Sequence, residues 1–467
     1  MKHKRILALL VVIALCLTGC EKKEVIEEEV NMPVSKEKVF QGMCGETSTI
    51  QVSMPTQQPS ILVDLHGYET QDEKIAIFRG ANLETEYYIC DALTDEVMYI
   101  GVLTEQVYHE QDDEYISYGD FTGFKGEGTY YIKTDVIGES YFFTISQDVK
   151  KATFKSLLAE FDNTYSELAQ NSYTAGCLLE PTIISADLMF SYRLYPGIYT
   201  DDLIEKYSAN KIPDVLEMIK IYTDWLLTLD TSLMLGDDLA AYAGVLSEFY
   251  EAYREFDRTY ANSCKKAAEN AYGILEDLED TQVKPELKFY ADAGLYNVTG
   301  YNKYNKAAKA YLEEVLAREE ISTQKSNEMA EAFDLLGKVS YISGTKGVDI
   351  KLCADIMNEF MDASEQVSGI SKESPYRVYS EDMIAILREL QKMVIVDFAV
   401  SSQEYRNVLE NHYHYILGRN KELINYLVMP QESLTESQNQ EQIKIKTGTW
   451  ESALFVLMIT EIMESGK

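Results

Sequence analysis

The chain has 467 residues, of which 77 are Asp or Glu and 42 are Lys or Arg, so its formal net charge is −35. A hydrophobic share of 46% is ample for packed cores and argues against a chain that is disordered throughout. The length predicts two or three domains. A protein this negative repels phosphate backbones, which argues against nucleic acid as a partner and favours neutral or cationic ligands.

Residues 1–19 predict a secretion signal. Three basic residues precede an apolar run over 6–17, which is shorter than the roughly 20 residues that a bilayer-spanning helix needs. The run ends in Leu-Thr-Gly-Cys at 17–20, which resembles the lipobox of bacterial lipoproteins, where cleavage before the cysteine leaves a lipid on the new N-terminus. We therefore predict lipidation of Cys20 and attachment to the outer face of the bacterial cytoplasmic membrane. An ordinary signal peptide or a short membrane anchor is the alternative.

Residues 20–59 are charged or polar with scattered proline and no sustained period, which predicts a tether. Beyond the signal and Cys20, five cysteines remain at wide spacings without a C-x-x-C pair: Cys44, Cys90, Cys177, Cys264 and Cys353. This set predicts neither a zinc site nor a disulfide framework, although a single bridge such as Cys44–Cys90 stays open. A sparse, odd number of cysteines suits the surface of a Gram-positive cell.

Residues 60–148 predict an immunoglobulin-like β-sandwich. Short segments rich in β-branched and aromatic residues alternate with turns that contain Gly or Asp. Seven strands are expected, at 60–65, 74–79, 87–91, 96–103, 115–118, 128–133 and 140–145. We expect no parallel sheet anywhere in the chain.

The first of these strands carries a family resemblance. Ile61-Leu-Val-Asp-Leu-His-Gly-Tyr resembles the opening strand pair of the immunoglobulin-like domain that precedes many family 9 glycoside hydrolases, the cellulase family with an (α/α)6 barrel. The segments at 118–124 and 126–133 resemble later strands of the same domain. The resemblance implies a structural domain that packs beside the barrel.

From residue 151 to 467 the apolar pattern changes from period 2 to period 3.6. Twelve helices are expected, at 153–170, 181–195, 213–229, 238–257, 260–277, 287–299, 303–318, 325–341, 348–363, 380–399, 402–418 and 448–464. Twelve helices of similar length suit six helical hairpins closed into a toroid. An open helical solenoid competes with this interpretation, but no fixed sequence period supports it.

Several helical segments resemble family 9 enzymes in the family's order. Pro213-Asp-Val-Leu followed by Trp225-Leu-Leu is one, and the loop Ser374-Pro-Tyr-Arg-Val is another. Tyr415-Ile-Leu-Gly-Arg-Asn is similar to the family's Tyr-Leu-Leu-Gly-Arg-Asn. The resemblance implies an (α/α)6 glycoside hydrolase-like body at 151–467.

The residues of the family's catalytic site are missing. Inverting glycosidases need one carboxylate that activates water and a carboxylic acid that protonates the leaving oxygen. Where the family has Asp-Ala-Gly-Asp, this chain has Thr174-Ala-Gly-Cys177, and five residues before Trp450, where the family has its acid, stands Ile445. The resemblance therefore implies that no catalytic carboxylate is left.

Glu180, Asp187 and Glu451 fall near these places, and of these Glu180 and Glu451 are the candidates for replacement carboxylates. We interpret them instead as residues at the N-termini of helices, where negative charge is favoured. No metal site is predicted, and calcium binding, which the family allows, has no support in the sequence because no EF-hand-like loop is present.

Three functions stay open. The first is a surface lipoprotein that binds a glycan or acts as a scaffold without hydrolysing it, with Tyr173, Tyr376, Arg377 and Trp450 lining the cleft. The second is an active but atypical glycosidase with replaced carboxylates. The third is a lipid-anchored subunit that binds a protein partner.

Overall fold

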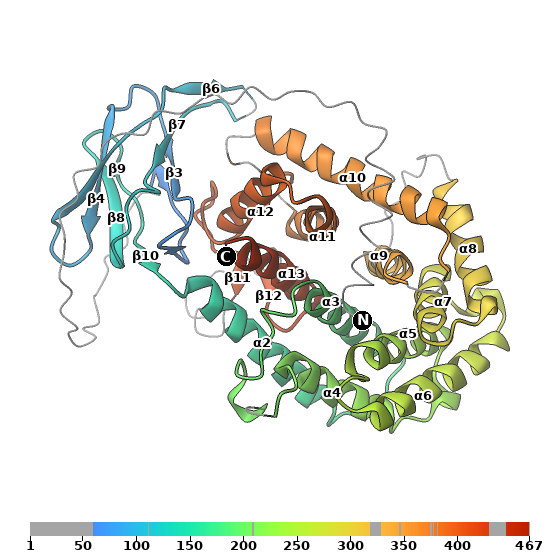
Figure 1. The fold of residues 1–467 in the computed structure, drawn as a ribbon. Coiled ribbons are helices and arrows are strands. Elements are labelled where there is room, and N and C mark those ends of the chain that lie inside the picture. Colours follow the sequence, from blue (N-terminus) through green and yellow to red (C-terminus); the bar gives the residue numbers. More distant parts are fainter. Residues whose placement is uncertain are drawn as a thin grey trace.

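The computed structural model describes residues 59–110, 112–207, 210–317, 328–344, 347–373, 376, 378–380, 382–428 and 445–466. The predicted signal peptide, Cys20 and nearly all of the predicted tether lie outside these residues. The described chain forms a β-sandwich followed by a ring of helices (Figure 1). None of the described helices combines the length and the apolar composition that a bilayer crossing needs.

The β-sandwich consists of two sheets that enclose a core around Phe78, Tyr87 and Ile132. One sheet has the order β1 (Ile61–Leu62), β3 (Ile75–Arg79), β7 (Glu114–Asp120) and β6 (Val107–His109). The other has the order β2 (Tyr68–Glu69), β10 (Phe143–Ser146), β8 (Gly128–Thr134), β4 (Glu86–Asp91) and β5 (Val97–Val102), with β9 (Gly138–Glu139) paired to β8. Alternate side chains of the strands face the opposite sheet, so each sheet buries one face.

The predicted sandwich is confirmed, and each of the seven predicted segments contains a strand. Strands β2, β6 and β9 are only two or three residues long, too short for alternation to reveal them. The expectation of no parallel sheet is wrong, because β2 pairs with β10 in parallel and β11 (Leu427–Val428) pairs in parallel with β12 (Ile445–Lys446). Parallel partners come from distant segments, so the pattern within one segment does not reveal them.

The helical body contains the twelve predicted helices, and their number is confirmed for the described residues. They are α2 (Val149–Leu168), α3 (Leu179–Leu194), α4 (Asp214–Leu226), α5 (Gly236–Tyr253), α6 (Arg258–Glu276), α7 (Pro285–Thr299), α8 (Asn302–Leu316), α9 (Glu328–Ile342), α10 (Ile350–Glu373), α11 (Met383–Val400), α12 (Gln403–Ile416) and α13 (Trp450–Ser465). Helix α10 runs ten residues beyond its predicted end. Its last turns pass through Gly369 because Val367 and Ser371 are buried there, and packing outweighs the low helix propensity of glycine.

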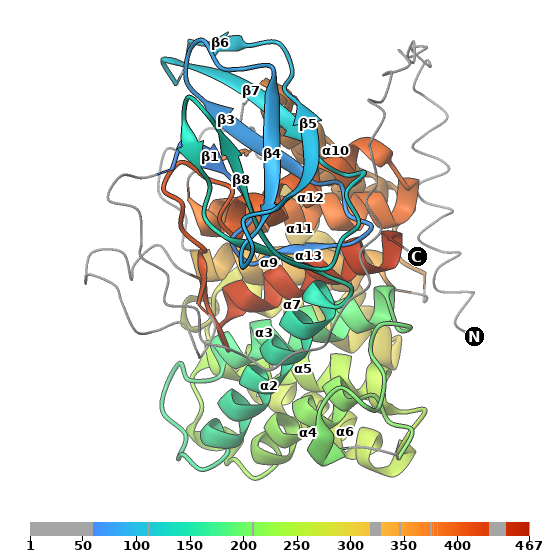
Figure 2. The same cartoon turned by 90° about the vertical axis from the view of Figure 1, so that its left-hand side faces the viewer.

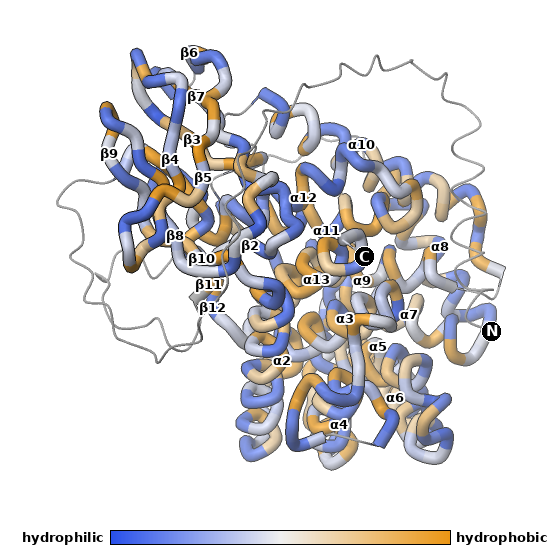
Figure 3. Tube along the Cα trace, turned by 60° about the vertical axis from the view of Figure 1, so that its left-hand side comes forward, coloured by the Kyte–Doolittle hydropathy of each residue, from blue (hydrophilic) through white to orange (hydrophobic). Residues whose placement is uncertain are grey.

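The helices alternate between an inner and an outer ring, as Figure 1 shows along the axis of the toroid and Figure 2 from the side. The inner ring consists of α3, α5, α7, α9, α11 and α13, and the other six helices cover it. Helices α3 and α13 are buried at most positions, whereas α6 and α8 bury a single stripe. Figure 3 shows the same contrast, with α11 and α13 mostly hydrophobic and α2 mixed. Polar groups on the inner ring must therefore find partners inside the ring.

A buried polar contact joins the β-sandwich to helix α12. Asp64, at the end of the first sandwich segment, accepts hydrogen bonds from the backbone N–H groups of His66 and Gly67 at 2.7 and 3.0 Å. Its other carboxylate oxygen lies 2.7 Å from Nδ1 of His414 in α12, and both side chains are buried. Burial raises the pKa of Asp64 and lowers that of His414, which keeps the imidazole neutral.

The backbone completes this contact one turn further along. The N–H of Leu65 donates to the carbonyl oxygen of Leu417 at 3.0 Å. Gly418 has a φ of 125°, and a Cβ at this position would lie 2.4 Å from the Leu65 side chain, so only glycine fits. The orientation of the two domains therefore depends on a few buried groups.

We expect Asp64→Ala to destabilise the protein by roughly 3 kcal/mol, because the variant leaves two backbone donors and His414 without their acceptor in a buried place. Urea unfolding followed by circular dichroism measures the change. Glu276→Ala is the control, since Glu276 forms an exposed ion pair with Lys303 and its loss should cost less than about 1 kcal/mol. An equal effect of both variants would contradict the role given to Asp64.

Candidate functional site

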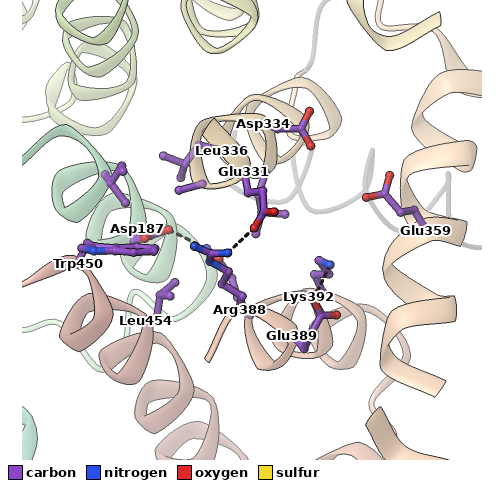
Figure 4. Close-up of a pocket in the computed structure, with 14 residues that line it drawn as sticks. Asp187, Glu331, Asp334, Leu336, Glu359, Arg388, Glu389, Lys392, Trp450 and Leu454 are labelled. Carbon is purple, nitrogen blue, oxygen red and sulfur yellow. Dashed lines mark hydrogen bonds and ion pairs between the residues drawn. The ribbon is translucent and has the colours of Figure 1, made fainter. Parts of the chain in front are cut away.

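A cavity of about 260 Å³ opens among the N-terminal parts of α3, α9, α11 and α13, with the middle of α10 as its outer wall. The ring leaves space here because α9 packs on α7 and α3, whereas α11 packs on α10, α12 and α13. Figure 4 shows Trp450, Asp187 and Leu454 on one side of the cavity and Asp334 and Glu359 on the opposite side. One side is thus partly apolar and the other side is charged.

The charged side consists of ion pairs between neighbouring helices. Lys338 of α9 is almost completely buried and lies 2.9 Å from Asp334 and 2.8 Å from Glu359 of α10. On α11, Lys392 lies 2.8 Å from Glu389. A buried charge without a partner is costly, so these pairs allow five charged side chains to stand around the cavity.

Arg388 of α11 connects the two sides. Its Nη1 donates to the carboxylate of Glu331 on α9, and its guanidinium lies over the Trp450 ring at 5.3 Å from the ring centre (Figure 4). A guanidinium stacked on an indole is held both by the ring's negative face and by apolar contact. Arg388 and Trp450 therefore fix each other's position at the mouth of the cavity.

Asp187 of α3 is the one carboxyl group of the lining that forms no ion pair with a described residue. It is 1% exposed, and its Oδ1 accepts a hydrogen bond of 2.7 Å from the Gln391 amide of α11. Burial raises the pKa of Asp187 to about 8, the Glu248 carboxyl raises it further, and the bond from Gln391 opposes the shift. At neutral pH this group is therefore a carboxylic acid that can donate a proton in a hydrogen bond.

The loop before α3, where the family resemblance places one catalytic carboxylate, is held by a buried carboxylate from another helix. Asp238, in the first turn of α5, accepts from the Tyr173 hydroxyl at 2.7 Å and from the N–H of Gly176 at 2.8 Å. The exposed Thr174 and the half-buried Cys177 occupy the loop itself. The loop is therefore well braced but carries no carboxylate of its own.

The second position at which the family resemblance places a catalytic carboxylate lies in the apolar core. Ile445 lies in β12 opposite Leu427 of β11, and it is 2% exposed. The start of the next helix nevertheless approaches the loop before α3, because Glu180 accepts a hydrogen bond from the backbone N–H of Trp450. Burial raises the pKa of Glu180, and the neighbouring Glu451 raises it further. The structure thus brings Glu180 and Glu451 together at one end of the inner ring.

Of the four residues predicted to line a glycan cleft, Trp450 alone lines this cavity. Tyr173 is directed to Asp238, and Arg377 lies outside the described residues. Tyr376 is 4% exposed and borders a different cavity, of about 290 Å³, where its hydroxyl donates to Glu114 of the β-sandwich. The structure therefore does not bring Tyr173 and Tyr376 to the cavity that Trp450 lines, and their hydroxyls serve the loop and the domain contact.

The sequence pattern does not single out Arg388, Glu331 or Lys338. These residues belong to helical segments whose charged residues are typical of outer helices. Only the arrangement of the helices in the ring shows that α9 and α11 are inner helices. Asp187 can be noticed in the sequence, because it is the charged residue within the mostly apolar segment Ile183–Phe190. Among the described side chains, no group of three or more His, Cys, Asp or Glu is placed to hold a metal ion.

Comparison with known proteins agrees with this architecture. The model of the cellulase N-terminal ig-like domain matches residues 56–139, and the model of glycosyl hydrolase family 9 matches residues 229–440. Residues 229–440 thus resemble glycosyl hydrolase family 9, and the sandwich before them resembles the domain that precedes cellulases. No curated protein sequence matches it.

The solved structures that this chain resembles are similar in fold at low sequence identity. A metagenome-derived family 9 endoglucanase has 15% identity and a TM-score of 0.65, with 86% of this chain and 98% of that chain covered. A family 9 protein of Bacteroides ovatus has 16% identity and a TM-score of 0.62, with 87% and 99% covered. AaCel9A in complex with cellobiose-like isofagomine has 12% identity and a TM-score of 0.64, with 87% and 100% covered.

The buried carboxyl of Asp187 makes the stability of the protein depend on pH. The unfolded chain releases the Asp187 proton near pH 4, whereas the folded protein keeps it up to about pH 8. Between these values the folded state binds more protons, so the free energy of unfolding falls as the pH rises. Asp187→Asn has no proton to lose, and we expect its stability relative to wild type to rise by at least about 1 kcal/mol between about pH 5 and pH 8.5.

Urea unfolding at a series of pH values measures this difference. Asp292→Asn is the matched comparison, because burial also raises the pKa of Asp292 on α7, to about 7. The stability of Asp292→Asn relative to wild type should stop rising at a lower pH than that of Asp187→Asn. A difference between Asp187→Asn and wild type that does not change with pH would contradict the assignment of a buried proton.

Proposed function

We propose that this chain is a lipid-anchored, glycan-binding protein on the outer face of the bacterial cytoplasmic membrane that does not hydrolyse its ligand. The observation that carries the proposal is that the described loop at 173–177 and strand β12 hold Thr174, Cys177 and the buried Ile445 where the family resemblance expects carboxylates. Inversion at a sugar carbon needs both carboxylates, so the reaction loses its base and its acid together.

The cavity supports the binding part of the proposal. An aromatic ring, neutral hydrogen-bonding groups and paired charges suit a sugar, whose carbon face is apolar and whose edge is hydroxylated. Trp450 supplies the ring, and Asp187 and Gln391 supply neutral polar groups. One structural relative was solved with cellobiose-like isofagomine, a sugar-like ligand, which is consistent with this class of ligand.

An atypical glycosidase is the second candidate. The observations that favour it are the raised pKa of Asp187 and the contact between Glu180 and Trp450 that brings Glu180 near Glu451. A proton-bearing carboxyl can act as a general acid where it reaches the leaving oxygen. A subunit that only binds a protein partner is the third candidate, and it stands if no sugar binds.

We expect binding without turnover. Titration with cello- or xylo-oligosaccharides should change the fluorescence of Trp450 at millimolar concentration or below, while soluble and crystalline β-1,4-glucan should release no reducing sugar above a blank. Loss of one general acid or base alone costs about 10²- to 10⁴-fold in rate. Reducing-sugar release that Glu180→Gln, Glu451→Gln or Asp187→Asn abolishes would instead establish the glycosidase.

The two tryptophans allow an internal control. Trp225 donates its indole N–H to the carbonyl of Asn171 and lies outside the cavity lining. Trp225→Phe should therefore keep the fluorescence change, and Trp450→Phe should remove it. If Trp225→Phe removes the fluorescence change and Trp450→Phe keeps it, the ligand binds elsewhere on the protein.

The anchor is tested separately. We expect Cys20→Ser to release the protein into the medium, because the thiol that would carry the lipid is gone and stable membrane retention needs two acyl chains. Cell fractionation followed by immunoblotting measures the distribution. Ser53→Ala, which alters another small residue before the first strand, should leave the protein with the membrane; membrane retention of Cys20→Ser would reject the lipid anchor.

A further inference from the structure

The cavity between α9 and α11 contains polar atoms without partners. Asp187 makes its only hydrogen bond to a described residue through Oδ1, to Gln391, which leaves Oδ2 available on the cavity wall. Nε and Nη2 of Arg388 are buried without a hydrogen bond, and Nη2 lies 3.8 Å from Glu328, beyond hydrogen-bond distance. Buried donors and acceptors in native proteins normally have partners, so these groups indicate a place for a ligand.

The charge of the lining selects among ligands. Five carboxyl groups line the cavity, those of Asp187, Glu331, Asp334, Glu359 and Glu389, against the two basic groups of Arg388 and Lys392. Lys338 behind the wall adds one more positive charge. Even with Asp187 protonated, carboxylates outnumber the basic groups. An anionic ligand would therefore be repelled, and a positively charged ligand would be attracted.

The volume of the cavity limits the size of the ligand. Pockets for drug-sized molecules span roughly 300–1,000 Å³, and this one has about 260 Å³. The space therefore suits one sugar unit and not several units side by side. The apolar wall formed by Trp450 and Leu454 suits the carbon face of such a ring (Figure 4).

We propose that this cavity binds one amino-sugar unit, with its ammonium group donating to Asp187 and its hydroxyl oxygens accepting from Arg388. This assignment rests on the proposed glycan-binding function and narrows its ligand to a cationic sugar. An ammonium group has donors and a positive charge, and that charge favours the ionised form of Asp187, so the carboxyl releases its proton to solvent when the ligand binds and Oδ2 becomes an acceptor. Ring hydroxyls are acceptors for the guanidinium. A single ligand of this kind satisfies Asp187 Oδ2 and the free Arg388 nitrogens together.

Three disaccharides with the same β-1,4 linkage test the proposal on the full-length protein. They are the glucosamine disaccharide, cellobiose and the N-acetylated glucosamine disaccharide, titrated by calorimetry at a pH where the amine is charged. We expect the glucosamine disaccharide to bind at least about tenfold more tightly than either neutral sugar. Asp187→Asn should reduce this preference to about onefold, whereas Asp292→Asn, which alters a buried carboxyl outside the cavity, should keep it.

The comparison of the three disaccharides needs only the wild-type protein, so a variant that fails to fold does not affect the test of the proposal. Equal or tighter binding of cellobiose would overturn the amino-sugar assignment and leave the glycan-binding function intact. Equal binding of the N-acetylated disaccharide would overturn it as well, because the acetyl group removes the charge. No binding of any of the three at millimolar concentration would reject both proposals.

Discussion

The six inner helices are enclosed by other helices on nearly every side, and this burial governs the chemistry of the protein. Water does not reach most of their side chains, so every polar group they carry has to find a partner from another helix. The pairs Lys338–Glu359 and Asp187–Gln391 follow from that constraint, and so does the stack of Arg388 on Trp450. Between α9 and α11 the inner helices leave a cavity, and its lining contains polar atoms without hydrogen-bond partners. This cavity is the candidate site.

The same constraint explains the fate of the expected catalytic positions. Ile445 packs into the core beside Leu427, a place where a lone carboxylate would lose its hydration without gaining a cation. Asp238 instead stabilises the loop at 173–177 from α5, with hydrogen bonds to Tyr173 and Gly176. Buried hydrogen bonds thus hold the loop, while residues other than carboxylates stand at the two places where the family resemblance expects catalytic groups.

Much of the architecture is readable in the chain because it depends on local periodicity. The change from period 2 to period 3.6 near residue 151 separates the sandwich from the helices, and all twelve helices are visible as repeated apolar stripes. Features that depend on contacts between segments far apart in the sequence cannot be predicted from local periodicity. The parallel pairs β2–β10 and β11–β12 and the extension of α10 through Gly369 are examples, since packing across the fold decides each of them.

The amino-acid sequence is enough to show the two-domain order, the family resemblance and the absence of acidic residues at 174, 177 and 445. These depend on residue identity and spacing along the chain, which folding does not alter. Folding is needed to bring Arg388, Glu331 and Asp187 together beside Trp450, and to place Tyr376 against Glu114 of the sandwich. The physical reason is that closing a ring brings together helices more than a hundred residues apart, and the burial that follows sets which charges are paired and which carboxyl keeps its proton.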